Sequence, residues 1–343
     1  MIELREAGVA DRAWDAFVAE HPESTLYNLS GWGPVARRAY GIQPFIVVSR
    51  AAPGAPIRGG MPLFLVSRLV SRYATSGIFG AYAPVLAESD EVRAEIFAAA
   101  LRFTEERRAA HIHVKALGEV PTPPGYSRHD IWVTAKLPLA GGAGAVWKRL
   151  RKSIRAAVKQ AERANLEVRW GRGELGSFYD VLADNMHRKG SPIYGYRFMQ
   201  EMADVFGDRV EVITLWTDGI PISGAITVEQ GGALYVPFAS SRAAYFKLRP
   251  YDLLYWKILQ RACERGLHTF DFGSSMRGST TLDFKTHFGC VVEPITSLVH
   301  TQDGSVPVLA PDNAAIRTVV KTWKAMPRGM ADALGPVVSR FIV

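Results

Sequence analysis

Cysteine is scarce in this chain, and its placement excludes several kinds of protein. Cys263 and Cys290 are the only two, and they form no CxxC pair. This argues against a disulfide framework and a cysteine-ligated zinc site, and a reducing compartment is expected. The sequence lacks a run of about 18 apolar residues, and its first residues carry acids without the apolar stretch of a signal peptide. We expect a cytoplasmic protein, with peripheral association at the inner membrane left open.

Several catalytic and cofactor motifs are also missing. The sequence contains no GxxxxGK[ST], no HExxH and no GxSxG, which excludes a P-loop and argues against those metalloprotease and hydrolase classes. His111 and His113 fall on one face of an expected strand together with Lys115, but no carboxylate is near them in sequence, so we expect no metal. The glycines at 141–144 do not follow the dinucleotide-binding pattern.

Length, composition and charge are those of a globular protein with an anionic partner. The 343 residues are too many for one typical domain, so two are expected. Hydrophobic residues make up 48% and charged residues 22%, which excludes wholesale disorder. Lysine and arginine number 41 against 33 acids, a net charge of +8, which favours phosphates, nucleic acid or a membrane surface without choosing among them.

Two halves of the chain share one order of expected elements. Each half has a helix (31–39; 198–205) and then two strand-like runs joined by a similar turn, GAPIRG at 54–59 and GIPISG at 219–224. A further strand (77–84; 233–239), a helix (90–107; 251–265) and a last strand (111–116; 269–272) follow in both. A repeat at an offset of roughly 160 residues usually means a repeated fold. Two unrelated α/β domains remain the alternative.

The expected fold class is α/β, with mixed sheets and helices on both faces. Pro and Gly gather at 138–144, so we place one domain at 1–143, a second at 144–300 and a tail at 301–343. In the tail we expect a strand at 306–309 and a helix at 312–325.

Residues 147–164 are expected to form one amphipathic helix with a basic face. Apolar residues recur every three or four positions, and the segment carries seven cations, Arg151 and Arg155 among them, against one acid, Glu162. Like charges at this spacing repel, which a bound anion would relieve. The open alternatives are a solvated face paired with acids from elsewhere, nucleotide phosphates, a tRNA backbone, or an anionic membrane surface.

The segment FDFGSSMRGSTTLDFKTHFG at 270–289 is the most informative in the chain. It begins as a buried-looking strand and breaks into a Gly/Ser/Thr loop with one cation, Arg277. It ends with Lys285 set between Phe284 and Phe288. A lysine among aromatics is costly to desolvate, so it usually has an anionic partner or a catalytic task. A lysine stem lying over two phenylalanines at the surface is the alternative.

The final FK..FG of this segment and the basic segment 147–168 resemble FemAB-like proteins, a branch of the acyltransferases with the GNAT fold. The pattern FDFG…RG……FK..FG most resembles the sequences of the subgroup associated with exosortase (PEP-CTERM) and exopolysaccharide loci. The founding members move an amino acid from aminoacyl-tRNA onto a peptidoglycan precursor. This chain lacks their coiled-coil arm, and the phosphate-binding arginine of their UDP-precursor site is not aligned, which leaves donor and acceptor open.

The resemblance implies two tandem GNAT-like domains, with the tail packed back on the first. It also implies that the loop holding Lys189, Ser191 and Tyr194 lines the cleft of the second domain. Ordinary GNAT enzymes carry a glycine-rich, phosphate-binding turn before their main helix. The corresponding stretch here has none and instead holds Arg249 and Asp252.

We therefore expect an acyltransferase or aminoacyltransferase acting on an amine or hydroxyl in cell-envelope or exopolysaccharide biosynthesis. Lys285 would stabilise the oxyanion, Phe284 and Phe288 would hold its stem, and Arg277 would bind substrate. Asp252, Asp271 and Asp283 are alternative bases. No tightly bound cofactor is expected, the anionic donor being nucleotide-linked or tRNA-linked (acyl-CoA or aminoacyl-tRNA). An acyl-CoA-dependent N-acyltransferase and a non-catalytic module for an anionic polymer or membrane remain alternatives.

Overall fold

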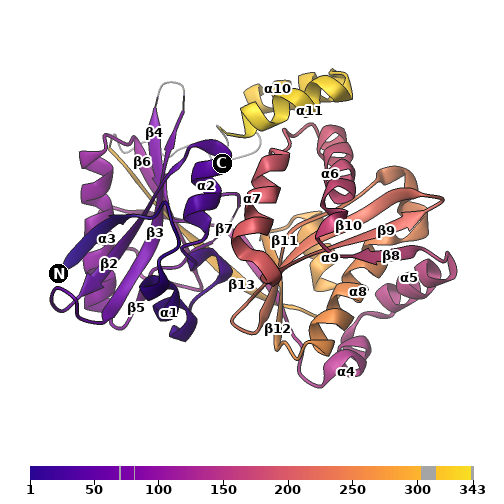
Figure 1. The fold of residues 1–343 in the computed structure, drawn as a ribbon, viewed down its shortest axis with the longest axis horizontal. Helices are drawn as coiled ribbons and strands as arrows, with labels where there is room; N and C mark the ends of the chain where they lie inside the picture. The colour runs from indigo at the N-terminus through magenta and orange to yellow at the C-terminus, as the bar shows by residue number, and fades with distance from the viewer. Residues whose placement is uncertain (69–70, 81, 303–313, 341–343) are drawn as a thin grey trace. The chain divides into compact units, whose positions relative to one another are not determined.

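The computed structural model describes residues 1–68, 71–80, 82–302 and 314–340, and the chain divides into two compact units (Figure 1). Of the described residues, the first unit contains those in 1–133 and 293–302 together with Arg340, and the second contains 134–292 and 314–339. The sequence placed the division at 143/144 and put residues 293–300 in the second domain. The structure instead returns them to the first unit, because strand β13 (Val291–Thr301) pairs with β6 (His111–Leu117) there.

The first unit is a mixed sheet with helices. Its strands lie in the order β1-β2-β3-β4-β6-β13-β7, and β5 pairs with β3. The remaining elements of this unit have these bounds: β1 Ile2–Glu6, α1 Arg12–Glu20, η1 Leu26–Asn28, α2 Trp32–Tyr40, β2 Gln43–Arg50, β3 Ile57–Ser67, β4 Arg72–Thr75, β5 Leu86–Ala87, α3 Asp90–Glu106 and β7 Ser127–Pro138. The first part of β7 belongs to this unit and the rest to the second.

The core of the first unit lies where α3 packs on β2 and β3. Along β6 the side chains alternate, and Ile112, Val114 and Ala116 are the buried members. A strand buried on one face is expected to alternate in this way, whereas β3 is buried almost continuously. The strand expected at 77–84 is wrong, because the strand is the earlier β4.

The second unit continues from β7 in the strand order β7-β12-β11-β10-β9-β8. Its strands are β8 Glu167–Trp170, β9 Val210–Thr217, β10 Ile220–Gln230, β11 Ala233–Ser241 and β12 Thr269–Met276. Its helices are α4 Gly142–Arg149, α5 Lys152–Arg163, η2 Arg172–Glu174, α6 Leu175–Lys189, α7 Tyr196–Phe206, η3 Gly207–Arg209, η4 Ala243–Leu248, α8 Pro250–Glu264, α9 Thr280–Thr286, α10 Ala314–Ala325 and α11 Arg328–Ser339.

The expected repeat is present in the pairing pattern. In the first unit β2, β3 and β4 pair antiparallel in turn, and β4 then pairs parallel with β6 across α3. In the second unit β9, β10 and β11 do the same, and β11 pairs parallel with β12 across α8. The mixed α/β class and the tandem arrangement of similar units are therefore confirmed.

The basic segment is two helices instead of one. α4 ends at Arg149, Leu150 and Arg151 have extended backbone angles, and α5 begins at Lys152. The break has a tertiary cause, because the backbone N–H of Arg151 donates to the carbonyl of His287, 3.1 Å away. α5 then buries Ile154 and Val158 and packs against α8.

The described part of the tail packs on the second unit, which corrects the expected return to the first domain. α10 and α11 contact α6, and His187 Nε2 lies 2.8 Å from the carbonyl oxygen of Met326. Arg328 pairs with Asp180 on α6. The strand expected at 306–309 lies outside the described residues. Among the described residues, no helix is both long and apolar enough to cross a membrane.

Candidate active site

Two parallel strands part in the middle of the second unit. β11 and β12 pair from Ala233 with Thr269 to Tyr235 with Asp271. β11 then continues to Ser241 alongside β10, and β12 continues to Met276, without further pairing between β11 and β12 among the described residues. Strands that part in this way leave backbone N–H and C=O groups able to bind an extended ligand.

Lys285 holds the segment of β12 that leaves β11. It lies in the last turn of α9, which Ser279 caps by accepting from the N–H of Leu282, and it is 5% exposed. Its Nζ donates to the carbonyl oxygens of Gly273 at 2.8 Å and Ser274 at 3.1 Å. An ammonium has three N–H donors, so a third remains beyond these two.

Burial disfavours the protonated form of Lys285, and the carboxylate of Asp271 favours it. Burial lowers the pKa of Lys285 to about 8, and the carboxylate of Asp271 opposes this shift. Asp271 is 1% exposed and accepts from the N–H of Gly273 at 2.7 Å and from Thr134 Oγ1 at 3.0 Å. These bonds fix the turn at Gly273, whose φ of 75° lies in the left-handed region. A positive charge therefore lies at neutral pH against the carbonyls of β12 that follow its last pairing with β11.

The two phenylalanines expected to flank Lys285 belong to an aromatic cluster between α8 and α9. The rings of Phe284 and Phe288 are 5.2 Å apart, and Tyr255 lies 5.6 and 5.7 Å from them. Phe288 is fully buried, so in this structure it supports α9 and offers no surface to a substrate. Tyr251 contacts Phe284 at 5.9 Å and donates from Oη to the carbonyl of Ala239 on β11, 3.2 Å away.

The N-terminus of α8 places Arg249 and Asp252 near His287. Arg249 has a φ of 55°, a left-handed conformation that glycine would adopt more easily, and Pro250 begins the helix without a side-chain cap. Asp252 is 8% exposed, and burial raises its pKa while Arg249 and then His287 oppose the shift. Arg249 itself is exposed.

The loop after α6 reaches β11 through one of its three predicted residues. The Tyr194 ring lies 5.6 Å from that of Phe238 on β11, and its carbonyl accepts from Tyr179 Oη at 3.0 Å. Lys189 is at the end of α6, where burial and then Arg188 lower its pKa. Ser191 follows Gly190, and neither Lys189 nor Ser191 has a hydrogen bond between its side chain and the Lys285 group among the described residues.

The cations of α5 remain without ion-pair partners among the described residues. Arg151, Lys152 and Lys159 are exposed and Arg155 is partly exposed. The expected alternative, pairing with acids from elsewhere in the fold, is therefore not observed there. Gln160 on α5 donates to the carbonyl of Lys247, 2.9 Å away, which brings η4 beside this basic face. Arg277 is exposed in the turn after β12.

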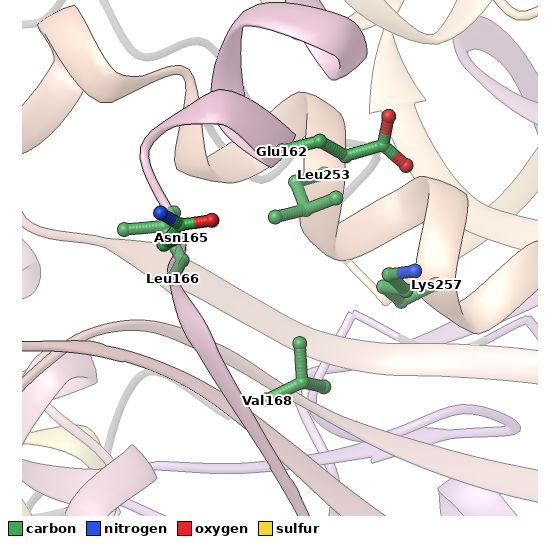
Figure 2. Close-up of a pocket in the computed structure, with 6 residues that line it drawn as sticks. All are labelled: Glu162, Asn165, Leu166, Val168, Leu253 and Lys257. Atoms are coloured by element: carbon green, nitrogen blue, oxygen red, sulfur yellow. The ribbon is translucent and has the colours of Figure 1, made fainter.

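A separate hollow of about 360 Å³ lies between the end of α5, β8 and α8 (Figure 2). Leu166, Val168 and Leu253 give it apolar walls, and Glu162 and Lys257 contribute one charge of each sign. No residue predicted for the site lines this hollow.

Several residues of this arrangement were not found from the sequence. Gly273, Thr134 and Tyr251 hold the Lys285 region through backbone and long-range contacts. Thr134 lies 137 residues before its partner Asp271, a pairing that only the fold creates. Gly273 carried the one usable signal, because a glycine inside a strand pattern often marks a local irregularity.

Comparisons with known proteins agree with this fold. The family described as "Acetyltransferase (GNAT) domain" matches residues 148–286, and no curated protein matches the sequence. The structure of FemX is similar with a TM-score of 0.66 at 13% identity, covering 88% of this chain and 98% of FemX. A tandem GNAT protein from the clavulanic acid biosynthesis pathway gives 0.56 at 11% identity, with 90% and 100% covered.

A third similar structure is the C-terminal domain of a putative lysylphosphatidylglycerol synthetase from Agrobacterium fabrum. Its TM-score is 0.51 at 14% identity, with 80% of this chain and 87% of that chain covered. At such identities the likeness concerns the fold: residues 148–286 in the second unit match the GNAT domain family, and the chain as a whole is similar in fold to FemX and to a tandem GNAT protein.

Proposed function

We propose that the protein transfers an activated acyl or aminoacyl group to an amine or hydroxyl acceptor in cell-envelope or exopolysaccharide biosynthesis. One observation carries the proposal: in the unit that matches the GNAT family, β11 and β12 part over a buried ammonium, Lys285. The exopolysaccharide-locus subgroup, which the residues 270–289 resemble, is part of this proposal.

In the proposed reaction, the acceptor nitrogen attacks the carbonyl carbon of an ester or thioester. A C–N bond forms, the C–O or C–S bond breaks, and the acceptor's proton leaves with the departing group or with solvent. Negative charge develops on the carbonyl oxygen, which Lys285 stabilises from beneath the parted strands. The bonds from its Nζ to Gly273 and Ser274 orient that charge.

Asp252 is proposed as the base that takes this proton on its way to the departing group or to solvent. Asp252 is the candidate whose environment fits, because burial raises its pKa toward the range in which a carboxylate can exchange protons. Asp271 is engaged with Gly273 and Thr134, and Asp283 is exposed. Positioning of the acceptor can supply the remaining rate.

The basic face of α5 is proposed to bind the anionic carrier of the acyl group. Its cations lack ion-pair partners among the described residues, and Arg151 is linked through its backbone to His287 at the end of α9. Both candidate donors, acyl-CoA and aminoacyl-tRNA, present phosphates that such a face attracts. The same face supports the second candidate function, a non-catalytic module for an anionic polymer or membrane surface.

Transfer assays with the full chain separate these functions. Acyl-CoA thioesters and charged tRNA are each supplied with a mixture of amine and hydroxyl acceptors, and release of free thiol or uncharged tRNA is followed. Turnover with either donor supports transfer and identifies the donor. Salt-sensitive binding of anionic polymers or vesicles without turnover would instead support the binding module.

A charge-reversal triple, Lys152→Glu with Arg155→Glu and Lys159→Glu, tests the donor-binding face. We expect a raised KM for the donor and a weaker dependence of KM on salt. The matched control reverses three exposed cations elsewhere, Arg12→Glu with Arg102→Glu and Lys321→Glu. Equal effects in the two triples would show that net charge alone matters.

A further inference from the structure

A second group of basic side chains lies in the first unit. On β6, Ile112, Val114 and Ala116 belong to the buried face of the strand. Because side chains alternate along a strand, His111, His113 and Lys115 share the opposite face. The Tyr73 ring of β4 stacks on His111 with centroids 5.0 Å apart.

The neighbouring strand β13 adds a hydroxyl to this face. Ser297 is the register partner of Lys115, and directly paired residues on adjacent strands project to the same side. His129 on β7 is near enough for its charge to act on His113. The group is therefore His111, His113, Lys115, His129 and Ser297, which we call the β6 basic group.

Three polar groups at this site have no partner among the described residues. Ser297 is 1% exposed, and its Oγ is buried without a hydrogen bond. His113 Nε2 is likewise buried and unpaired. Lys115, which is partly exposed, has no side-chain hydrogen bond or ion pair with the described residues, and its backbone N–H donates to Ser76 Oγ at 3.0 Å. Buried polar groups are normally satisfied, so two buried, unpaired atoms beside an unpaired ammonium call for a missing partner.

The charges around these groups indicate that the missing partner is an anion. Burial lowers the pKa of Lys115 to about 8, and no carboxylate opposes it. The pKa of His113 is held well below its usual value by burial and then by Lys115, His111 and His129. The described residues hold no cluster of three His, Cys, Asp or Glu side chains suited to a metal. An incoming anion would supply acceptors for the ammonium, the imidazole N–H and the hydroxyl together.

We propose that the β6 basic group of the first unit is a binding site for a small oxyanion, presented as a carboxylate or a phosphate group. Lys115, His113 and Ser297 donate to its oxygens. This site is separate from acyl transfer, and the binding test below gives its result whether or not the chain turns over any donor.

The test measures the thermal unfolding of the full chain in sodium phosphate, sodium acetate and sodium chloride at equal ionic strength. We expect phosphate or acetate to raise Tm saturably beyond chloride, and whichever does so identifies the group recognised. In Lys115→Met this anion-dependent rise is lost, while Tm in chloride stays equal or increases because a desolvated charge has been removed. The control Lys321→Met, an exposed lysine on α10, keeps the rise.

Ser297→Ala is the second variant, because it changes the site by one atom and leaves the strand intact. We expect the anion Kd to increase about tenfold, the effect of one hydrogen bond to a charged group. The proposal is overturned if neither anion gives a saturable rise in the unaltered chain. It is also overturned if Lys115→Met and Ser297→Ala keep the full rise, which would place the bound anion elsewhere, for example on α5.

Discussion

In each unit one pair of parallel strands separates after a few paired residues: β4 and β6 in the first, β11 and β12 in the second. Different groups bind the separated strands in the two units. In the first, pairing ends at Thr75 with His113, and Ser76 then bridges the strands. Its N–H donates to His113 O and its Oγ accepts from Lys115 N, both at 3.0 Å. In the second, Lys285 from α9 binds β12 at Gly273 and Ser274, just past the paired residues.

The helices that follow β4 and β11 differ in the same sense. α3 begins with Ser89, whose Oγ accepts from the N–H of Val92, and with two acids, Asp90 and Glu91. α8 begins without a side-chain cap behind Arg249. Acidic side chains at a helix N-terminus neutralise the positive end of the helix dipole, which would otherwise attract an anion. The comparison teaches that the two units share one topology, while the uncapped helix start and the lysine bound to the parted strand belong to the second unit.

Removing Lys285, which binds β12 in the second unit, should have the largest effect on activity. Lys285→Met should lower kcat about 10²–10³-fold, because it removes a positive charge placed for the oxyanion. Ser76→Ala removes the corresponding bridge in the first unit and should lower the free energy of unfolding by about 1 kcal/mol with kcat unchanged. Steady-state kinetics and denaturant unfolding measure both. Equal losses of kcat in the two variants would contradict a division of roles.

Lys285 should also leave a signature in the pH dependence of stability. Its pKa is lowered in the folded state, so the unfolded state holds the proton more tightly. Below pH 8 both states are protonated and the cost of burying the charge is fully present. Between pH 8 and 10.5 the folded state loses its proton first, and stability rises by about 3 kcal/mol.

The difference in unfolding free energy between the unaltered chain and Lys285→Met isolates this contribution, since other titrating groups cancel. Urea unfolding at several pH values across that window provides the measurement. A difference that stays flat with pH would show that the lysine is not desolvated.

Alanine substitutions at two glycines distinguish an effect on stability from an effect on activity. Gly273 and Gly118 have φ values of 75° and 78°, and each has room for a methyl group, so alanine at either is strained without a steric clash. Each substitution should lower the unfolding free energy by about 1–2 kcal/mol. Gly273→Ala alone should lower kcat/KM, because it displaces the carbonyls that Lys285 binds. Matched kinetic losses would place Gly273 outside the site.

The smallest effect is expected at the start of α8. Arg249→Ala should raise KM for an anionic donor about two- to fivefold, the size of an exposed charge at a helix terminus. Ser89→Ala, which removes the cap of α3, should instead lower the unfolding free energy by about 1 kcal/mol and leave KM unchanged. A KM that does not respond to Arg249→Ala would direct the search for the donor to α5.

The parts of the fold that could be read from the sequence are those set by local pattern. The turns at 54–59 and 219–224, the alternation along β6 and the apolar stripe of α5 each come from residues close in sequence. The break at Leu150 could not be read, because no proline or glycine marks it and its cause is a bond to His287. The same holds for β13, whose partner β6 lies far back in the chain.

The candidate site was predictable in its residues and less so in their roles. Lys285, Phe284 and Phe288 do lie together, but the two carbonyls that Lys285 binds follow from the φ of Gly273. Phe288 was expected to hold the stem of Lys285, and the structure places it in the core, where it anchors the short helix α9. Residues far apart in sequence, such as Thr134 and Asp271, meet only through sheet order.

The place of β13 between β6 and β7 has a consequence for how the protein is made. The ribosome has produced β6 and the first part of β7 well before β13 emerges, since residues 139–290 come in between. At 5–20 residues per second that interval lasts roughly 8 to 30 seconds. Throughout it the nascent first unit exposes unpaired strand edges at β6 and β7, so the N-terminal part of this polypeptide completes its sheet last.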